Sequence, residues 1–137
     1  TYRNKVDGSI NVVLQKGRVV PDEPTLVRMH SISIFSDVLG LAGPRKRTLQ
    51  RAMSEIGRHG SGIIVVLMPN DAEKLQNEIG GKEPEGGDLR AYGIGAQILA
   101  DLGVHEMILL TNAHRNVVGL EGYGLQVVGE RSIPMND

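Results

Sequence analysis

The sequence of 137 residues contains no cysteine and no tryptophan, and it has only one phenylalanine and three tyrosines. Without cysteine the chain forms no disulfide, has no thiolate nucleophile and offers no sulfur ligand to a zinc ion. With so few aromatic side chains, its hydrophobic core must be aliphatic. These absences exclude disulfide scaffolds, thiol catalysis and every zinc site that uses sulfur ligands.

The chain also lacks an excess of charge of either sign, because 15 Lys and Arg face 16 Asp and Glu, for a formal net charge of -1. Proteins that bind nucleic acid or anionic membranes gain affinity from surplus basic side chains. The longest apolar runs, such as Gly62–Met68 and Met107–Leu110, are too short to cross a bilayer, and the N-terminus shows no signal-peptide pattern. We expect no nucleic-acid partner, no membrane contact and a cytoplasmic location.

The length is typical of one domain, so we expect a single domain over residues 1–137. Alternating apolar residues predict strands at Asn11–Leu14 and Thr25–Ser33, and we expect these two strands to be neighbours. Helical spacing predicts a helix over Thr48–Arg58. The continuous apolar run Gly62–Met68 then predicts a strand buried on both faces.

The second half of the chain again alternates predicted helices and strands. In chain order we expect a short helix at Asp71–Ile79, a loop at Gly80–Gly87, a helix capped by Asp88 that ends near Leu102–Gly103, a strand at Met107–Leu110, a short helix at Asn116–Gly119 and a strand at Leu125–Val128. This alternation predicts an α/β domain with an at least partly parallel sheet.

Three polar segments are candidates for ligand binding. Asp88 and Arg90 lie at a predicted helix start, where backbone N–H groups and the guanidinium could hold an anion; an ordinary Asp cap beside a solvated Arg is the alternative. Arg28 and His30 share one strand face, either to bind a phosphate together or as a half-exposed polar face. The segment Thr111–His114 follows a buried strand and suits either ligand contact or a turn.

Two other patterns have plain structural alternatives. Gly93-Ile94-Gly95 resembles the opening of a dinucleotide fingerprint, but no third glycine follows, so close packing by another element explains it better. The basic cluster Arg45–Arg47 with Arg51 is either a surface patch or a phosphate-facing loop. The four histidines show no metal-binding spacing, and we predict no bound metal.

A set of longer segments identifies a family. In chain order the chain carries Arg28–Ser31, Asp88–Leu99, Asp101–Val104, Leu109–Asn112 and Gly119–Leu125. Together these segments resemble GTP cyclohydrolase II, the enzyme that opens riboflavin biosynthesis. The resemblance is collinear and extends from Tyr2 to Pro134.

The resemblance implies a GTP cyclohydrolase II-like α/β fold, with a mixed sheet and flanking helices. It also implies a homodimer and, as in many bacterial proteins, fusion to an upstream domain that resembles 3,4-dihydroxy-2-butanone 4-phosphate synthase. Relative to the family, the chain is expected to start one strand late and to stop before the C-terminal tail.

The chain departs from the family where the family binds its catalytic zinc through three cysteines. Ser33 stands at the first of these positions, and Leu41–Arg45 replaces the Cys-x-Cys pair. A serine hydroxyl is not deprotonated at neutral pH and cannot replace a thiolate. We therefore expect no zinc and no other cofactor.

Three further departures affect ligand recognition. Ile32 replaces an acidic residue, Met68–Asp71 replaces an Arg-Gln-Glu-Gly-Arg stretch, and Asn116 stands at the position of a ligand-binding lysine.

Part of the family's site survives in this sequence. Asp88 and Arg90 match the pair that the family uses as general base and as nucleophile or phosphate anchor, and Arg28 and Thr111 match phosphate- or nucleotide-contacting positions. The leading hypothesis is a catalytically inactive domain with an assembly or regulatory role. The alternatives are a zinc-independent enzyme acting on a nucleotide or sugar phosphate, and a non-catalytic sensor of GTP, pyrophosphate or phosphate.

Overall fold

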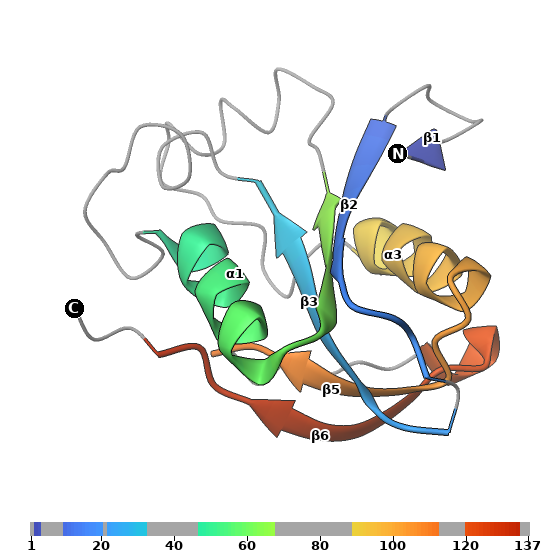
Figure 1. The fold of residues 1–137 in the computed structure, drawn as a ribbon. Helices are drawn as coiled ribbons and strands as arrows, with labels where there is room; N and C mark the ends of the chain where they lie inside the picture. Colours follow the sequence, from blue (N-terminus) through green and yellow to red (C-terminus); the bar gives the residue numbers. More distant parts are fainter. Residues whose placement is uncertain are drawn as a thin grey trace.

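The computed structural model describes residues 2–3, 10–20, 22–32, 47–67, 89–112 and 120–134. These residues form a six-stranded mixed sheet with helices packed against it (Figure 1). The elements are β1 (Tyr2–Arg3), β2 (Ile10–Lys16), β3 (Thr25–Ser31), α1 (Thr48–His59), β4 (Gly62–Leu67), α3 (Leu89–Asp101), β5 (Glu106–Leu110), the 3-10 helix η2 (Leu120–Tyr123) and β6 (Gln126–Arg131).

The strands lie in the order β1-β2-β4-β3-β5-β6. The four strands β4, β3, β5 and β6 are parallel, whereas β2 pairs antiparallel with β4 and β1 antiparallel with β2. Helix α1 connects β3 to β4, and α3 lies between β4 and β5 in the chain. The predicted α/β class with a mixed sheet and flanking helices is confirmed.

The prediction that the first two long strands are neighbours is wrong, because β4 lies between β2 and β3. Val12 of β2 pairs with Val66, and Met29 of β3 pairs with Val65 on the other side of β4. All six residues of β4 are buried. A strand that is apolar on both faces is most stable inside a sheet, with a partner along each edge, and β4 takes that place.

Helix α1 confirms the predicted helix, with one more residue at its C-terminal end. Gly60 ends the helix with φ 102° and donates its N–H to the carbonyl of Ile56 at 2.9 Å. That left-handed conformation favours glycine. Ala52 and Ile56 are buried, and both belong to the core cluster that also contains Ile64 and Val66 of β4.

The core consists of two clusters, one on each face of the sheet, and among the described residues the buried hydrophobic side chains are aliphatic or methionine, as predicted. Alternating residues of one strand enter different clusters, because successive side chains point to opposite faces. The α3 cluster contains Val27, Met29, Ile63, Val65, Leu67, Ala96, Ile98, Leu99, Val104, Met107 and Leu125. The α1 cluster contains Leu26, Ala52, Ile56, Ile64, Val66, Leu110 and Ile133.

The predicted helix after Asp88 and the two predicted C-terminal strands are confirmed as α3, β5 and β6. The ends of these elements differ from the predicted ends by one to three residues. The predicted helices at Asp71–Ile79 and Asn116–Gly119 and the predicted loop at Gly80–Gly87 lie outside the described residues. Within the described ranges, neither helix has the length and apolar character that a membrane span requires.

Candidate functional site

The carboxyl ends of three adjacent parallel strands meet at one edge of the sheet. Strand β3 lies between β4 and β5, and the three strands end at Ser31, Leu67 and Leu110. A helix that connects two parallel strands runs back along the sheet, so α1 and α3 both begin near this carboxyl edge. Open α/β sheets bind ligands at such an edge.

Arg28 and Thr111, two of the predicted contact residues, are brought together here. The Arg28 guanidinium donates from Nη1 to the carbonyl oxygen of Leu110 at 3.3 Å, and Leu110 directly precedes Thr111. Arg28 is partly buried, on a strand whose neighbouring residues are mostly buried. Its charge therefore lies beside the end of β5.

His30 holds the other side of the same guanidinium. Nη2 of Arg28 lies 3.4 Å from Nδ1 of His30, and His30 is fully buried. Because a guanidinium only donates, Nδ1 of His30 is the acceptor if this contact is a hydrogen bond. The prediction of a half-exposed polar face is wrong for His30, because its side chain is fully buried. The two residues do share a face, as the strand alternation predicted.

Arg90 occupies the first turn of α3, and Asp88 directly precedes the described part of that helix. The core cluster of α3 lies on the face of β3 opposite to Arg28, because Met29 belongs to it. Arg28 and the start of α3 therefore approach the carboxyl edge from opposite faces of the sheet. The side-chain position of Arg90 and all of Asp88 lie outside the described residues, so their predicted roles remain predictions.

The loop after β5 is held by the C-terminal segment. Thr111 donates its backbone N–H to the carbonyl of Arg131 at 2.8 Å. Nδ2 of Asn112 donates to the carbonyl of Ile133 at 3.1 Å, and the Ile133 N–H donates to Oδ1 of Asn112 at 2.7 Å. Asn112 thus clamps the chain after β6, which favours the turn interpretation for this residue. Ala113 and His114 lie outside the described residues.

The glycine pair in α3 serves packing. A Cβ on Gly95 would lie 3.3 Å from Sδ of Met29, and one on Gly93 would lie 3.4 Å from the hydroxyl of Tyr123. The helix therefore approaches β3 and η2 closely at these two positions. This agrees with the packing interpretation of Gly93-Ile94-Gly95.

The basic cluster is only partly described. Arg47 is exposed and directly precedes α1 with φ 57°, and its carbonyl accepts the N–H of Arg51 at 2.9 Å. The first turn of α1 contains no acidic residue. Arg45 and Lys46 lie outside the described residues.

One cluster of charged residues was missed by the sequence analysis. Glu55 of α1 is only 5% exposed and forms an ion pair with Arg131 at the end of β6. Nη1 of Arg131 also lies 3.3 Å from Nδ1 of His59, and Arg58 approaches Glu55 at 3.9 Å. The cluster fastens α1 to the last strand. The only sequence signal was a glutamate next to the apolar stripe of the helix.

The N-terminal strand is fastened to α3 by a second polar contact. The hydroxyl of Tyr2 donates to Oδ2 of Asp101 at 2.8 Å. Burial raises the pKa of Tyr2 above 10.0, and the hydrogen bond to Asp101 and the negative charge of that carboxylate raise it further.

The described fold is an α/β domain in which Arg28 and Thr111 lie near the carboxyl edge of the sheet. Comparison with known proteins is more specific. A family model described as GTP cyclohydrolase II matches residues 1–132, and the chain belongs to this family.

Curated relatives of the chain are proteins named riboflavin biosynthesis protein RibBA. The protein from Bacillus cytotoxicus is 40% identical over 93% of this chain, and those from Aquifex aeolicus and Bacillus cereus are 39% identical over the same share. The chain spans 36% of the length of each of these relatives. It is thus similar to one part of a longer riboflavin biosynthesis protein.

The side chains of this domain do not fit the three-thiolate zinc site that the family resemblance implies. The whole chain has no cysteine, and in its described part no three His, Asp or Glu residues gather as a metal-binding group. Ser33 and Leu41–Arg45, which stand at the thiolate positions, lie outside the described residues. A hydroxyl group is a poor substitute for a thiolate at zinc, so this chain does not supply the family's metal ligands.

Proposed function

We propose that the chain is a GTP cyclohydrolase II-like domain of a riboflavin biosynthesis protein that has lost GTP ring opening and serves assembly or regulation. The observation that carries the proposal is the complete lack of cysteine in a chain that matches the family over residues 1–132. A zinc ion that polarises substrate and activates water contributes several kcal/mol to such a hydrolysis. Asp88 and Arg90 alone do not supply that contribution.

The partners follow from the same proposal. The relatives are longer proteins, of which this chain spans 36%. We infer that this domain is fused to a 3,4-dihydroxy-2-butanone 4-phosphate synthase domain, forms a homodimer and works in the cytoplasm. Its assembly role would be to hold or regulate the synthase domain.

Metal content and formate release test this function. The purified chain is expected to contain no stoichiometric zinc and to release no formate from GTP, also after incubation with zinc. A RibBA relative serves as the active control in both measurements. One tightly held zinc per chain, or formate release from GTP, would overturn the proposal.

A second candidate is a nucleotide or phosphate sensor without turnover. The contact of the Arg28 guanidinium with the carbonyl of Leu110 favours it, because a positive charge then lies next to Thr111. Phosphate and pyrophosphate bind readily to such guanidinium groups. Arg90 and the start of α3 would complete this anion site. Calorimetric titration with GTP, pyrophosphate and flavins separates a sensor from a purely structural domain.

A further inference from the structure

Helix α1 packs over one face of the sheet, and Val12 of strand β2 contributes to the core cluster on that same face. Nζ of Lys16, at the end of β2, donates to the carbonyl oxygen of Gly57 in α1 at 3.4 Å. Met53 lies one helical turn before Gly57, and Leu14 lies two residues before Lys16 on the same strand face. Met53 shares a helix face with Gly57, and Leu14 shares a strand face with Lys16. Because Lys16 contacts Gly57, Met53 and Leu14 border a common surface.

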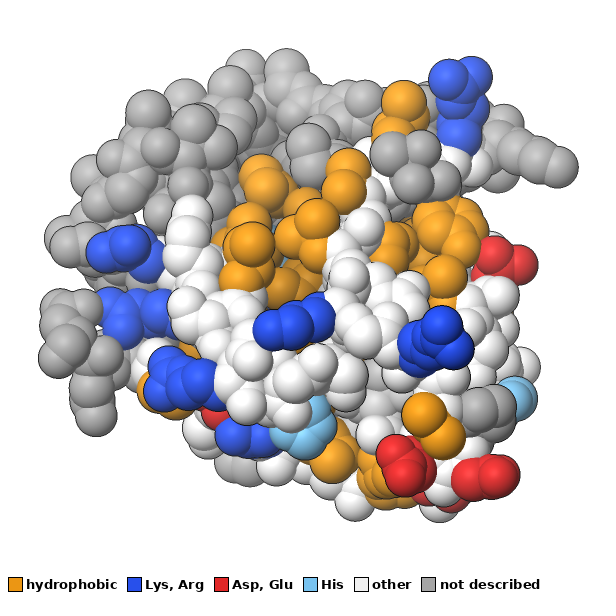
Figure 2. All heavy atoms as spheres, viewed as in Figure 1, with side chains coloured by type: hydrophobic (Ala, Val, Ile, Leu, Met, Phe, Trp, Pro, Cys, Tyr) orange, Lys and Arg blue, Asp and Glu red, His pale blue; other side chains and the backbone are white. Residues whose placement is uncertain are grey.

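The side chains on this surface are apolar and remain open to solvent. Met53 is 48% exposed, Ile10 45% and Leu14 38%, although all three are large hydrophobic residues. Val12 and Leu49 are partly buried against the core cluster beneath them. We call these five residues the α1–β2 apolar surface. Figure 2 shows hydrophobic side chains gathered in the middle of this face.

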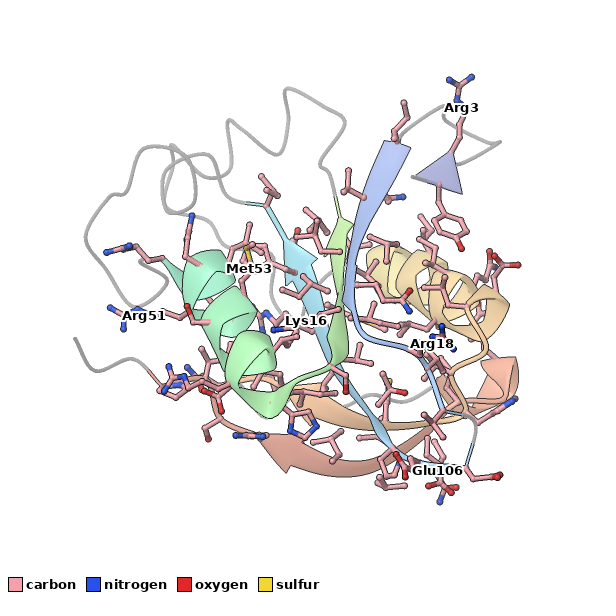
Figure 3. The ribbon with its side chains drawn as sticks, viewed as in Figure 1. Arg3, Lys16, Arg18, Arg51, Met53 and Glu106 are labelled. Carbon is pink, nitrogen blue, oxygen red and sulfur yellow. The ribbon has the colours of Figure 1, made fainter. Side chains whose placement is uncertain are left out.

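Positive charge lies along one border of the α1–β2 apolar surface. Figure 3 shows Lys16 between α1 and β2 and Arg18 beyond the end of β2, whereas Arg51 lies on the outer side of α1, away from this surface. Glu106 lies well away, at the start of β5 (Figure 3). In Figure 2 blue side chains lie along the lower border of the apolar region, whereas red side chains lie farther from it, toward the lower and right parts of the view. The nearest acidic group of α1, Glu55, is buried and paired with Arg131.

We propose that the α1–β2 apolar surface is a docking site for an acidic polypeptide segment with apolar side chains at its centre. Burial of the aliphatic side chains supplies the affinity, and Lys16 and Arg18 at the border of the surface select a partner of negative charge. A single-stranded nucleic acid fits less well, because its bases need aromatic side chains for stacking, and the five residues are all aliphatic. The surface includes neither Arg28 nor Thr111, so this inference is independent of the proposed function.

A peptide of alternating glutamate and leucine tests the proposal with the full chain. We expect it to bind with a dissociation constant on the order of 0.1 mM or tighter by fluorescence anisotropy. Met53→Asp and Leu14→Asp should each weaken binding about tenfold or more, because each places a negative charge in the apolar centre. Val128→Asp is the matched control, since Val128 is 45% exposed but lies on β6.

Lys16→Glu and salt test the charge component. The variant should weaken binding about tenfold, and about 0.5 M salt should weaken binding to the unaltered chain. A peptide with lysine in place of glutamate should not bind. Far-ultraviolet circular dichroism verifies that each variant is folded, and the salt and lysine-peptide measurements need no variant.

Any one of the following results would overturn the proposal. The first is equal binding by the unaltered chain, Met53→Asp and Val128→Asp. The second is equal binding of the glutamate and lysine peptides, or stronger binding to anionic phospholipid vesicles than to the glutamate peptide. The third is conversion of a dimeric chain to monomers by Met53→Asp and Leu14→Asp in sedimentation, because the occupant would then be a second copy of this chain.

Discussion

Asn112 illustrates how a residue near a candidate site can serve the fold. Its side chain both donates to and accepts from the backbone of Ile133, in the way that one strand would pair with another. Ile133 is only 2% exposed and belongs to the α1 core cluster. The clamp therefore positions a core residue and, at the same time, the loop that carries Thr111.

Asn112→Ala should lower the free energy of unfolding by about 1–3 kcal/mol, because it removes two hydrogen bonds and leaves backbone groups of Ile133 without their partner. Asn112→Asp keeps the acceptor for the Ile133 N–H but places an oxygen against the Ile133 carbonyl, so it should also destabilise. Urea denaturation measures both. If both variants unfold at the urea concentration of the unaltered chain, the clamp contributes no stability.

The contact between Tyr2 and Asp101 predicts a pH dependence. The folded state raises the pKa of Tyr2, so it holds the phenol proton more tightly than the unfolded state does. The stabilising contribution is fully present below pH 10.0 and is lost as the pH rises through the higher folded pKa.

Unfolding free energies measured from about pH 8 to pH 11 test this sign. The unaltered chain should lose more stability over this range than Tyr2→Phe, which has no titrating hydroxyl at this position. The difference between the two curves removes the contributions of the other tyrosines and lysines. A difference that stays constant with pH would contradict the prediction.

At the scale of elements, two helical glycines should respond differently to the same substitution. Alanine is more favourable than glycine inside a helix by about 1 kcal/mol. A Cβ on Gly57 would meet nothing within 4 Å, whereas one on Gly95 would lie 3.3 Å from Sδ of Met29.

We therefore expect Gly57→Ala to raise the free energy of unfolding by about 0.5–1 kcal/mol. Gly95→Ala should change it by less than about 0.5 kcal/mol, because the displaced methionine offsets the helical gain. Thermal and urea unfolding of the two variants measure the contrast. Equal stabilisation by both would show that α3 does not depend on its close approach to β3.

The elements that the sequence predicted best are those with a strong local pattern. The apolar spacing of α1 and the continuous apolar run of β4 each determine the element from neighbouring residues alone. The pairing of strands was not predictable in this way. Val12 pairs with Val66, and no local signal distinguishes that partner from β3.

In the candidate site, too, only the features with a local sequence pattern were predictable. Alternation on β3 predicted that Arg28 and His30 share a face, and the structure agrees. The burial of His30 and the pairing of Glu55 with Arg131 depend on where α1 and β6 lie in space. Such placement follows from packing among distant segments and leaves little trace in the sequence around each residue.

At the scale of the whole molecule, the proposed anion site predicts weak binding with little preference for the base. Charge-assisted contacts to arginine contribute about 1.5–3 kcal/mol each, but the entropy of binding offsets much of this. We expect pyrophosphate to bind with a dissociation constant on the order of 0.1–1 mM. GTP should bind less than about tenfold more tightly than ATP, since several recognition residues of the family are replaced.

Titration of the unaltered chain and Arg90→Ala with pyrophosphate, GTP and ATP tests this prediction. The variant should bind pyrophosphate more weakly, while its unfolding transition stays unchanged. An unchanged pyrophosphate affinity would remove Arg90 from the site. A preference for GTP over ATP of tenfold or more would refute the loss of the guanine pocket.

The order of the strands also determines when the chain can fold during synthesis. Strand β3 is central, yet its two partners, β4 and β5, begin at Gly62 and Glu106, 31 and 75 residues after the end of β3 at Ser31. Closing such long loops has a substantial entropic cost, and sheets paired across them form slowly. A nascent chain that ends before β5 therefore exposes one edge of β3 and part of its apolar surface. The domain completes its fold only when nearly all of it has been translated.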